Sequence, residues 1–451
     1  MIQTFVNAWK VPELRKKLLF TLMIILLYRI GANLFIPYIN VDQIESFSTF
    51  FSDGIFGMLS LMSGSAFSQG TFFALSVSPY ITASIVIQLL SIAIPALERL
   101  SKDEDGKKKL TAATRWVTVG LSIITAYGYV NLFSMNEGWL TVKKGDSNYV
   151  FAWFVMIACL CAGASLIMWL AEKINEHGIG NGISMILFAN IISGMTGTVQ
   201  GTVNMLKDKF GEWKTGWELV LGIVGVIASI ALTLAAIVLI VWFTNSERRI
   251  KVIYAKKVVG RKTYGGQKTN LPLKMNMAGV MPVIFASSIV SLPATIAAFF
   301  PNSGFAKFIN EFFNYNTWLY LIINMALIIV FAYFYVLISF NPVEVANNIQ
   351  KNGGSIPGIR SGKPTIMYIK KILNRVTLIG AIFLCIISGL PMLINIVITT
   401  IDPHSVAFSA IAFGGNSLLI VVGVALETVR DLDAQLALRN MSGSKTKGLF
   451  G

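Results

Sequence analysis

The sequence predicts an all-α polytopic membrane protein with ten transmembrane helices. Of its 451 residues, 55% are hydrophobic and only 13% are charged, whereas a soluble domain carries roughly 25% charged residues. Ten apolar windows are long enough to cross a hydrocarbon core, which needs about 20 helical residues. Their approximate limits are 18–37, 72–97, 113–134, 150–171, 183–205, 217–244, 277–300, 317–340, 376–397 and 411–428.

The ten windows divide into two groups of five, within residues 1–205 and 206–451. Because five is odd, two consecutive halves of five helices have opposite orientations in the membrane. Inverted halves of this kind place a central site at their interface. The helix count alone supports this division, since no identity between the halves is visible. We expect two inverted five-helix halves around a central pore.

Basic residues predict the orientation of the chain and two large loops. With the N-terminus in the cytoplasm, most of the 37 Lys and Arg residues lie on the cytoplasmic side, as the positive-inside rule requires. Both termini are then cytoplasmic. The loops 245–276 and 341–375 are long and basic, which fits contact with anionic lipids or docking of a large acidic partner. In the first loop, β-branched residues among the basic ones predict a short hairpin around Gly265-Gly266.

Residues 57–70 form an apolar segment that is too short to span the membrane. Serines and glycines interrupt it, and a glycine at each end allows the chain to hinge. A short segment that leads into a full apolar window is typical of a re-entrant helix. Irregular backbone at membrane depth survives only beside protein or a water-filled cavity. The segment therefore predicts a pore, which it enters from the external side.

Catalytic motifs are missing from the sequence. It contains no GxxxxGK[ST] phosphate loop and no HExxH zinc motif. The three cysteines, Cys159, Cys161 and Cys385, lie inside apolar windows without metal-binding spacing. Intramembrane charge is nearly confined to Arg29, whereas ion-coupled carriers usually bury more. We expect no enzyme activity, no metal and no cofactor.

Five segments in order resemble those of the bacterial SecY family, the channel subunits of the general preprotein translocase. They are SVSPYITASIVIQLL (76–90), GIGNGIS (178–184), NMAGVMPVIFASSI (276–289), IPGIR (356–360) and FGGNSLLIVVGV (413–424). Each segment alone is weak evidence for the family, but five such segments in the same order along the chain are specific for it. The resemblance runs from Leu18 to the C-terminus and implies ten helices arranged as an hourglass around a pore.

The resemblance implies a ring of branched apolar side chains at the waist of this pore. The ring positions are Val77, Ile81, Ile183, Leu187, Ile284 and Ile420. Two of them are Val and Leu where isoleucine is common in the family. The i,i+4 spacing within the first two pairs makes each pair face one way from its helix. An aliphatic constriction dewets and blocks ions, yet offers no hydrogen bond to a passing chain. The alternative is that these are ordinary core or lipid-facing residues.

The segment 57–70 resembles the plug of the family, which rests against the ring from outside while the channel is idle. Its serine and glycine content suits loose packing that can be displaced. A fixed external cap is the alternative interpretation. The plug residues are Gly57, Met58, Leu59, Ser60, Leu61, Met62, Ser63, Gly64, Ser65, Ala66, Phe67, Ser68, Gln69 and Gly70.

The windows 72–97 and 277–300 resemble the two helices of the family's lateral gate. Polar side chains on these windows would pair when the gate is shut and contact a signal sequence when it opens. They are Thr82 and Gln88 on the first window, and Ser287 and Ser288 on the second. Ordinary interhelical hydrogen bonding without gating is the alternative.

The resemblance also implies partners and a location. The basic loops would dock the SecA motor or a translating ribosome, with Arg248, Arg249, Lys256 and Arg360 as contacts. A guanidinium group can fork onto a carboxylate or a phosphate. The family implies the small membrane subunits SecE and SecG, an unfolded preprotein with a signal sequence, and the bacterial plasma membrane.

The predicted function is a protein-conducting channel, driven by an external motor or ribosome, that releases hydrophobic segments sideways into lipid. A secondary transporter of a small solute also fits ten helices in inverted halves, but it predicts paired charges within the membrane. A receptor or scaffold for ribosomes would use the basic loops without conduction. In such a receptor, polar substitutions at the ring positions would leave the permeability barrier unchanged.

Overall fold

The computed structural model describes residues 2–43, 60, 63–135, 138–142, 146, 148–195, 216–254, 257–259, 262–264, 268–299, 303–312, 317–401 and 415–447. Each of the ten predicted windows overlaps at least one helix, so the helical class is confirmed. The ten helices are α2 (Pro12–Gly31), α5 (Ser78–Ala93), α7 (Glu104–Met135), α8 (Tyr149–His177), the helix Gly182–Met195, α10 (Gly216–Asn245), α11 (Met281–Phe299), α13 (Trp318–Ser339), α15 (Lys363–Ile401) and α17 (Gly415–Lys447).

Four helical stretches among the described residues could cross a membrane by length and composition alone. They are Glu104–Ser134, Tyr149–His177, Trp318–Lys351 and Lys363–Ile394. A fifth is added if α5 and α6 (Pro95–Lys102) count as one broken span. Three further apolar helices are shorter: Gly182–Met195, Ile230–Asn245 and Met281–Ala297.

The helix in the window 72–97 is shorter than the window predicted. Hydrogen-bonded turns occupy residues 72–77, and Pro79 stands in the first turn of α5. At the other end, Ile94 has extended backbone and α6 departs at 107°. Pro95 is the reason, because a proline disfavours helical backbone in the residue before it. Hydropathy alone does not register this break.

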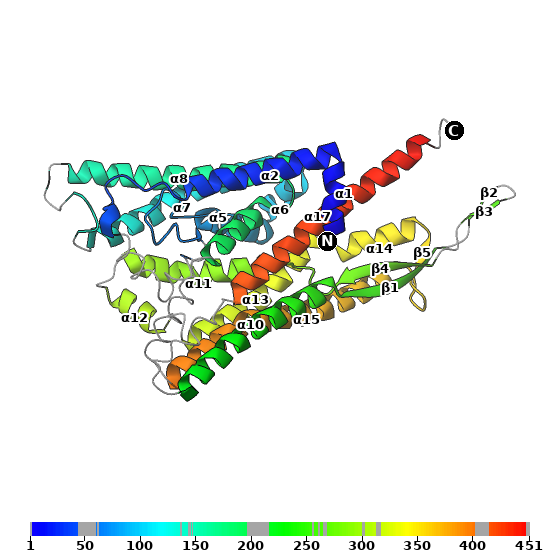
Figure 1. Ribbon diagram of the computed structural model, residues 1–451. Coiled ribbons are helices and arrows are strands. Elements are labelled where there is room, and N and C mark those ends of the chain that lie inside the picture. Colours follow the sequence, from blue (N-terminus) through cyan, green and yellow to red (C-terminus); the bar gives the residue numbers. More distant parts are fainter. Residues whose placement is uncertain are drawn as a thin grey trace.

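The helices gather into two groups in Figure 1. The helices α2, α7 and α8 lie along one side of the molecule, and α13 and α15 pack together on the other side. The helix α11 contacts α5 and α7 as well as α13, so it joins the two groups. The helix α17 packs against α10, α15 and the short N-terminal helix α1 (Ile2–Lys10). The predicted boundary at residue 205 lies outside the described residues.

The two long basic loops form one small β-module. Strand β1 (Glu247–Tyr254) pairs antiparallel with β4 (Lys268–Lys274) on one edge and with β5 (Gly354–Ser355) on the other. Ile250 and Val252 alternate inward on β1 and pack against Ile349 of α14 (Pro342–Lys351) and Ile369 of α15. One apolar face therefore joins loop 245–276 to loop 341–375.

Loop 245–276 contains an antiparallel hairpin, as expected. Its strands β2 (Lys257–Val259) and β3 (Lys262–Tyr264) pair with Val259 opposite Lys262. The predicted turn residues Gly265-Gly266 lie outside the described residues. The remaining short helices are η1 (Val41–Gln43) and α12 (Gly304–Phe312).

Candidate functional site at the pore waist

The six predicted ring residues lie in a single apolar cluster where the helices converge. Four separate parts of the chain supply them: α5 with the residue before it, the helix Gly182–Met195, α11 and α17. Five are no more than 3% exposed, namely Val77, Ile81, Leu187, Ile284 and Ile420, and Ile183 packs partly buried against them. The structure brings these residues together, and their role as a pore ring stays a prediction.

A capped helix start sets the direction of Ile183 and Leu187. The Asn181 side-chain oxygen accepts hydrogen bonds from the backbone N–H groups of Ile183 (3.0 Å) and Ser184 (3.4 Å), as an N-cap does. At Gly182 a Cβ atom would lie only 2.0 Å from a carbonyl oxygen of α8. The motif GNG therefore seats this helix tightly against α8, and both ring residues follow within two turns.

The described part of the plug comprises Ser60 and residues 63–70, and the other predicted plug residues, 57–59 and 61–62, lie outside the described residues. Residues 64–70 form turns, so the re-entrant helix does not continue past Ser63. Its serines form hydrogen bonds with backbone groups of the same segment. The Ser63 hydroxyl donates to the Ser60 carbonyl (3.0 Å) and accepts from the Phe67 N–H (3.0 Å). Local bonding of this kind competes with helix formation.

The plug sits between two apolar clusters. Ala66 is 1% exposed and belongs to the same cluster as the ring residues. The next residue, Phe67, packs against a second cluster formed mainly by α7 and α8, with its ring edge-on to Tyr129 at 5.0 Å. The Tyr129 hydroxyl donates a hydrogen bond to the Phe67 carbonyl (2.5 Å). This segment therefore covers the waist on one side.

The gate residues lie on two helices that pack together, α5 and α11. Thr82, Ser287 and Ser288 are buried, and Gln88 is partly buried. Among the described residues, no hydrogen bond joins these four side chains across the two helices. The Ser287 hydroxyl donates to the Ile284 carbonyl (3.0 Å) within its own helix, the usual alternative for a helical serine. The expected pairing across the shut gate is therefore absent from this structure.

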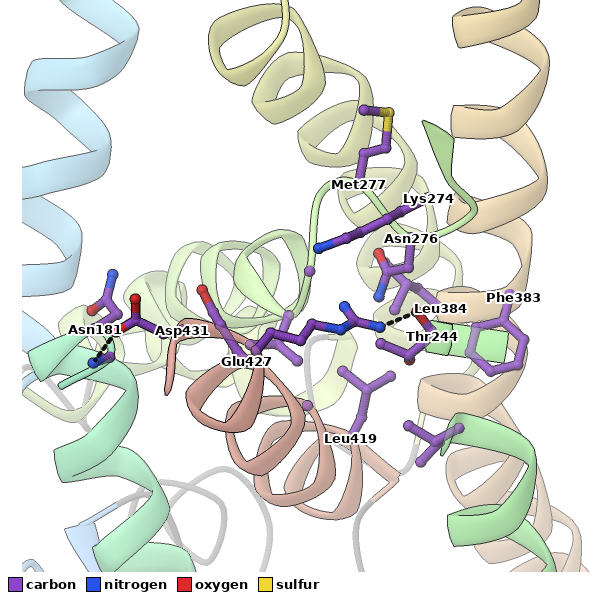
Figure 2. Close-up of a pocket in the computed structure, with 16 residues that line it drawn as sticks. Asn181, Thr244, Lys274, Asn276, Met277, Phe383, Leu384, Leu419, Glu427 and Asp431 are labelled. Atoms are coloured by element: carbon purple, nitrogen blue, oxygen red, sulfur yellow. Dashed lines mark hydrogen bonds between the residues drawn. The ribbon is translucent and has the colours of Figure 1, made fainter. Parts of the chain in front are cut away.

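A cavity of about 480 Å³ borders the apolar cluster, because Phe383, Leu384 and Leu419 belong to both (Figure 2). Its lining combines apolar groups such as Leu419, the neighbour of Ile420, with charged groups from α17 and β4. Arg430 donates hydrogen bonds to the Thr244 carbonyl (2.5 Å) and the Asn245 side chain (2.9 Å). Partial burial lowers the pKa of the Lys274 ammonium group here. The cluster that contains the ring residues therefore contacts both this partly polar cavity and the plug.

The predicted docking residues are exposed on the β-module. Arg248 and Arg249 lie on β1, and Arg249 forms an exposed ion pair with Glu247 (2.6 Å). Arg360 lies in the loop that follows β5, where the Thr365 hydroxyl donates to its carbonyl (2.9 Å). Lys256 lies outside the described residues. Because the two loops share one core, Arg248 and Arg360 belong to one module.

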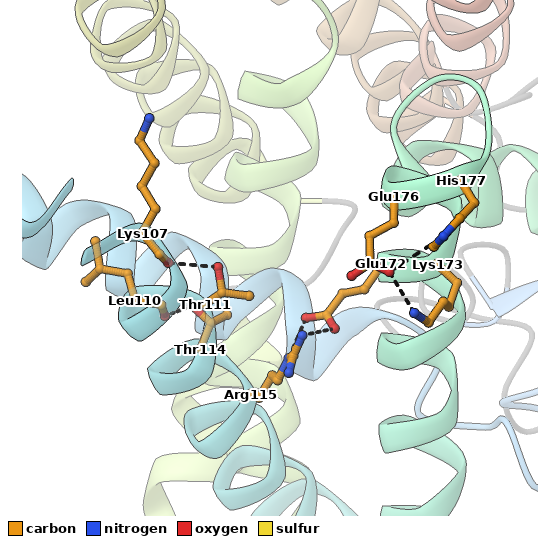
Figure 3. Close-up of polar contacts among 9 residues, drawn as sticks. All are labelled: Lys107, Leu110, Thr111, Thr114, Arg115, Glu172, Lys173, Glu176 and His177. Atoms are coloured by element: carbon orange, nitrogen blue, oxygen red, sulfur yellow. Dashed lines mark hydrogen bonds and ion pairs between the residues drawn. The ribbon is translucent and has the colours of Figure 1, made fainter. Parts of the chain in front are cut away.

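The structure contains an ion pair between α7 and α8 that the sequence analysis does not predict. Two nitrogens of Arg115 contact the two carboxylate oxygens of Glu172, at 3.0 Å and 2.8 Å (Figure 3). The Glu172 side chain is only 11% exposed, whereas that of Arg115 is 49% exposed. The available signal was a pair of opposite charges at the facing ends of two consecutive windows, 113–134 and 150–171. Among the described residues, no group of three His, Cys, Asp or Glu side chains could hold a metal ion.

Converging apolar helices that bury one shared cluster, in contact with both the plug segment and a partly polar cavity, are the architecture of a multi-pass membrane channel. The SecY family model matches residues 71–429. The protein translocase subunit SecY of Thermus thermophilus is 39% identical over 449 residues, which cover 99% of this chain and 98% of that protein. The subunit of Bacillus subtilis is 40% identical and covers 98% of this chain and 99% of its own length. The chain belongs to the SecY family.

Solved structures have the same fold. A SecY structure, described for the role of its plug domain in stabilising the closed channel, aligns with a TM-score of 0.62 at 18% identity, covering 94% of this chain and 95% of that one. Sec61 in a canine ribosome–channel complex aligns with a TM-score of 0.56 at 16% identity and the same coverage. Together with the family match, they make this protein a membrane-embedded protein translocation channel.

Proposed function

We propose that unfolded secretory polypeptides pass through the waist formed by the six ring residues. The observation that carries this proposal is their convergence, from four separate parts of the chain, into one buried apolar cluster. An aliphatic ring excludes ions by dewetting and forms no hydrogen bonds with the polypeptide. Passage is driven by an external motor or ribosome, and the chain itself catalyses no reaction.

The plug seals the waist in the idle channel and leaves when a polypeptide enters. Its apolar contacts include Ala66 against the ring cluster and Phe67 against the cluster of α7 and α8. Most of its described hydrogen bonds are internal, so displacement breaks few bonds to the rest of the channel. An exception is the bond from Tyr129. This arrangement favours a movable plug over a fixed cap.

A hydrophobic segment leaves sideways between α5 and α11, which form the lateral gate. These helices are joined by packing, since no hydrogen bond links Thr82 or Gln88 to Ser287 or Ser288 among the described residues. The Ser288 hydroxyl is buried and has no hydrogen-bond partner in the described part of the chain, which disfavours the closed interface. A signal helix that separates α5 from α11 therefore loses apolar contacts only and replaces them with its own.

The β-module is the docking platform for the SecA motor or a ribosome, with Arg248, Arg249, Lys256 and Arg360 as contacts. Exposed guanidinium groups on a rigid module suit carboxylates of a protein or phosphates of RNA. SecE and SecG complete the channel, and anionic lipids contact its basic loops. Residues 1–205 and 206–451 form the two inverted halves, and both termini lie on the cytoplasmic side of a bacterial plasma membrane.

Site-specific photocrosslinking from position 284 tests the pore assignment. A secretory precursor is stalled halfway across the membrane, and a photoreactive residue replaces Ile284. The control position is Val330 on α13, which is 59% exposed on the outside of the helical bundle. We expect a crosslink to the precursor from position 284 and none from position 330. A precursor bound at the cytoplasmic loops without a crosslink at 284 would indicate a receptor instead of a channel.

The secondary transporter remains the second candidate from the helix count, but the structure provides little for it. Among the described residues, the ion pair that joins the helices of two predicted windows is Arg115–Glu172, in which the carboxylate is nearly buried and the arginine is half exposed. Neither residue lines the cavity of about 480 Å³ or belongs to the ring cluster. Uptake of a labelled small solute that depends on this pair would favour the transporter.

A further inference from the structure

Arg29, the charged residue within the first predicted span, is only half paired. Its Nη2 atom donates a hydrogen bond to the Ser193 hydroxyl on the helix Gly182–Met195. Its Nη1 atom is buried and has no hydrogen-bond partner among the described residues. None of the ion pairs among the described residues includes Arg29. Because arginine does not lose its proton in proteins, a charged donor stays unsatisfied here.

The plug is what covers this unsatisfied nitrogen. Gly64 lies so close that a Cβ atom placed on it would be 3.0 Å from Arg29 Nη1 and 2.9 Å from the Asn190 carbonyl oxygen. The backbone of Gly64 has a φ of +65°, which glycine adopts without strain. Its neighbour Ser63 is only 1% exposed. The turn at Gly64 therefore closes over the guanidinium group and the helix behind it.

We propose that Arg29 determines how strong a signal sequence must be to open the channel, because its guanidinium group disfavours the seated plug. With the plug in place, Nη1 is removed from water without an acceptor, which is unfavourable for a charged donor. With the plug displaced, water reaches Nη1 while Ser193 still holds Nη2. Arg29 thus biases the plug toward leaving. This inference rests on the proposed function, in which the plug moves.

Two substitutions distinguish this role from the opposite one, in which Arg29 acts as a latch that stabilises the seated plug. Arg29→Met keeps an unbranched stem but removes the charge, so the seated plug becomes more stable. The open population should then fall roughly tenfold or more. Ser193→Ala leaves the guanidinium group without its acceptor and should raise the open population. A latch that holds the plug would be loosened by both substitutions.

The plug position is measured by labelling a cysteine at Ala66, which is 1% exposed when the plug is seated. The complete channel complex is used in spheroplasts, with the three native cysteines replaced by serine and a membrane-impermeant maleimide added outside. Labelling rates are compared with and without a stalled precursor. Export of a precursor with a weak signal is measured in parallel. Arg29→Gln serves as a second uncharged variant if Arg29→Met does not accumulate.

We expect slower labelling and poorer weak-signal export in Arg29→Met, and the reverse in Ser193→Ala. Faster labelling in Arg29→Met would identify a latch and overturn the inference, as would equal rates in all variants. In both of those cases, a stalled precursor should still accelerate labelling of the unmodified channel, because the proposed function requires the plug to move whatever the role of Arg29. If the precursor has no effect on that channel, the plug does not move, and the proposed function fails together with this inference.

Discussion

Replacing Ile284 with asparagine should open the waist, because this residue is fully buried in the ring cluster. Removing its aliphatic side chain from the cluster sacrifices about 1.5–3 kcal/mol of hydrophobic stabilisation. Burying the amide without partners adds about 1–3 kcal/mol. The closed waist therefore loses about 2.5–6 kcal/mol in Ile284→Asn. In the open state the amide is hydrated, so most of this penalty falls on the closed state and shifts the equilibrium by about thirtyfold or more.

Two assays measure this shift: ion conductance of the idle channel in planar bilayers, and export of a precursor with a defective signal sequence. Both should increase in Ile284→Asn and change little in Ile284→Val, which keeps the waist apolar. The matched control is Ile396→Asn, because Ile396 is 3% exposed in a separate cluster formed by α11, α13 and α15 that contains no ring residue. It should lower stability without relaxing signal selectivity. Unchanged conductance and selectivity in Ile284→Asn, or equal changes in Ile396→Asn, would refute the reasoning.

Three further predictions concern the plug, the docking platform and the ion pair. Gly64→Ala should loosen the plug and raise idle conductance, because its Cβ would lie 2.9 Å from a carbonyl oxygen at a φ of +65°. Arg360→Glu should abolish motor-driven export without unfolding the channel, as measured in membrane vesicles with purified motor. Arg115→Ala should destabilise the protein by about 2–3 kcal/mol and Glu172→Ala by about 1 kcal/mol in thermal unfolding, because only the carboxylate is left buried.

Each of these predictions has a result that contradicts it. For the plug, idle conductance no higher than that of the unmodified channel would show that the turn at Gly64 tolerates a side chain. For docking, the control is Lys307→Glu in a predicted external loop, and equal loss of export in both variants would indicate a general charge effect. For the ion pair, equal destabilisation by the two alanine substitutions would mean that the burial of Glu172 does not decide its energetic role.

Local patterns were sufficient for the helices and for part of the site. Every span satisfies its own backbone hydrogen bonds in lipid, so each helix leaves an apolar window in the sequence. The spacing of Val77 to Ile81, and of Ile183 to Leu187, also placed each pair on one face of its helix. Hydropathy did not predict where the helices are interrupted, because serine hydrogen bonds and proline break a helix without changing its apolar character. The turns in the plug and the bend before Pro95 are both of this kind.

Contacts between distant parts of the chain were decided only by the tertiary structure. Arg29 meets Ser193 across 164 residues, and no pattern near either residue predicts that contact. The Ser287 hydroxyl bonds within its own helix and not across the gate. The sequence by itself determined that the chain is a ten-helix membrane protein of the SecY family, since hydropathy and collinear motifs are local. Which side chains form the waist and which cover the guanidinium depends on how the helices pack, because packing joins residues that the chain keeps far apart.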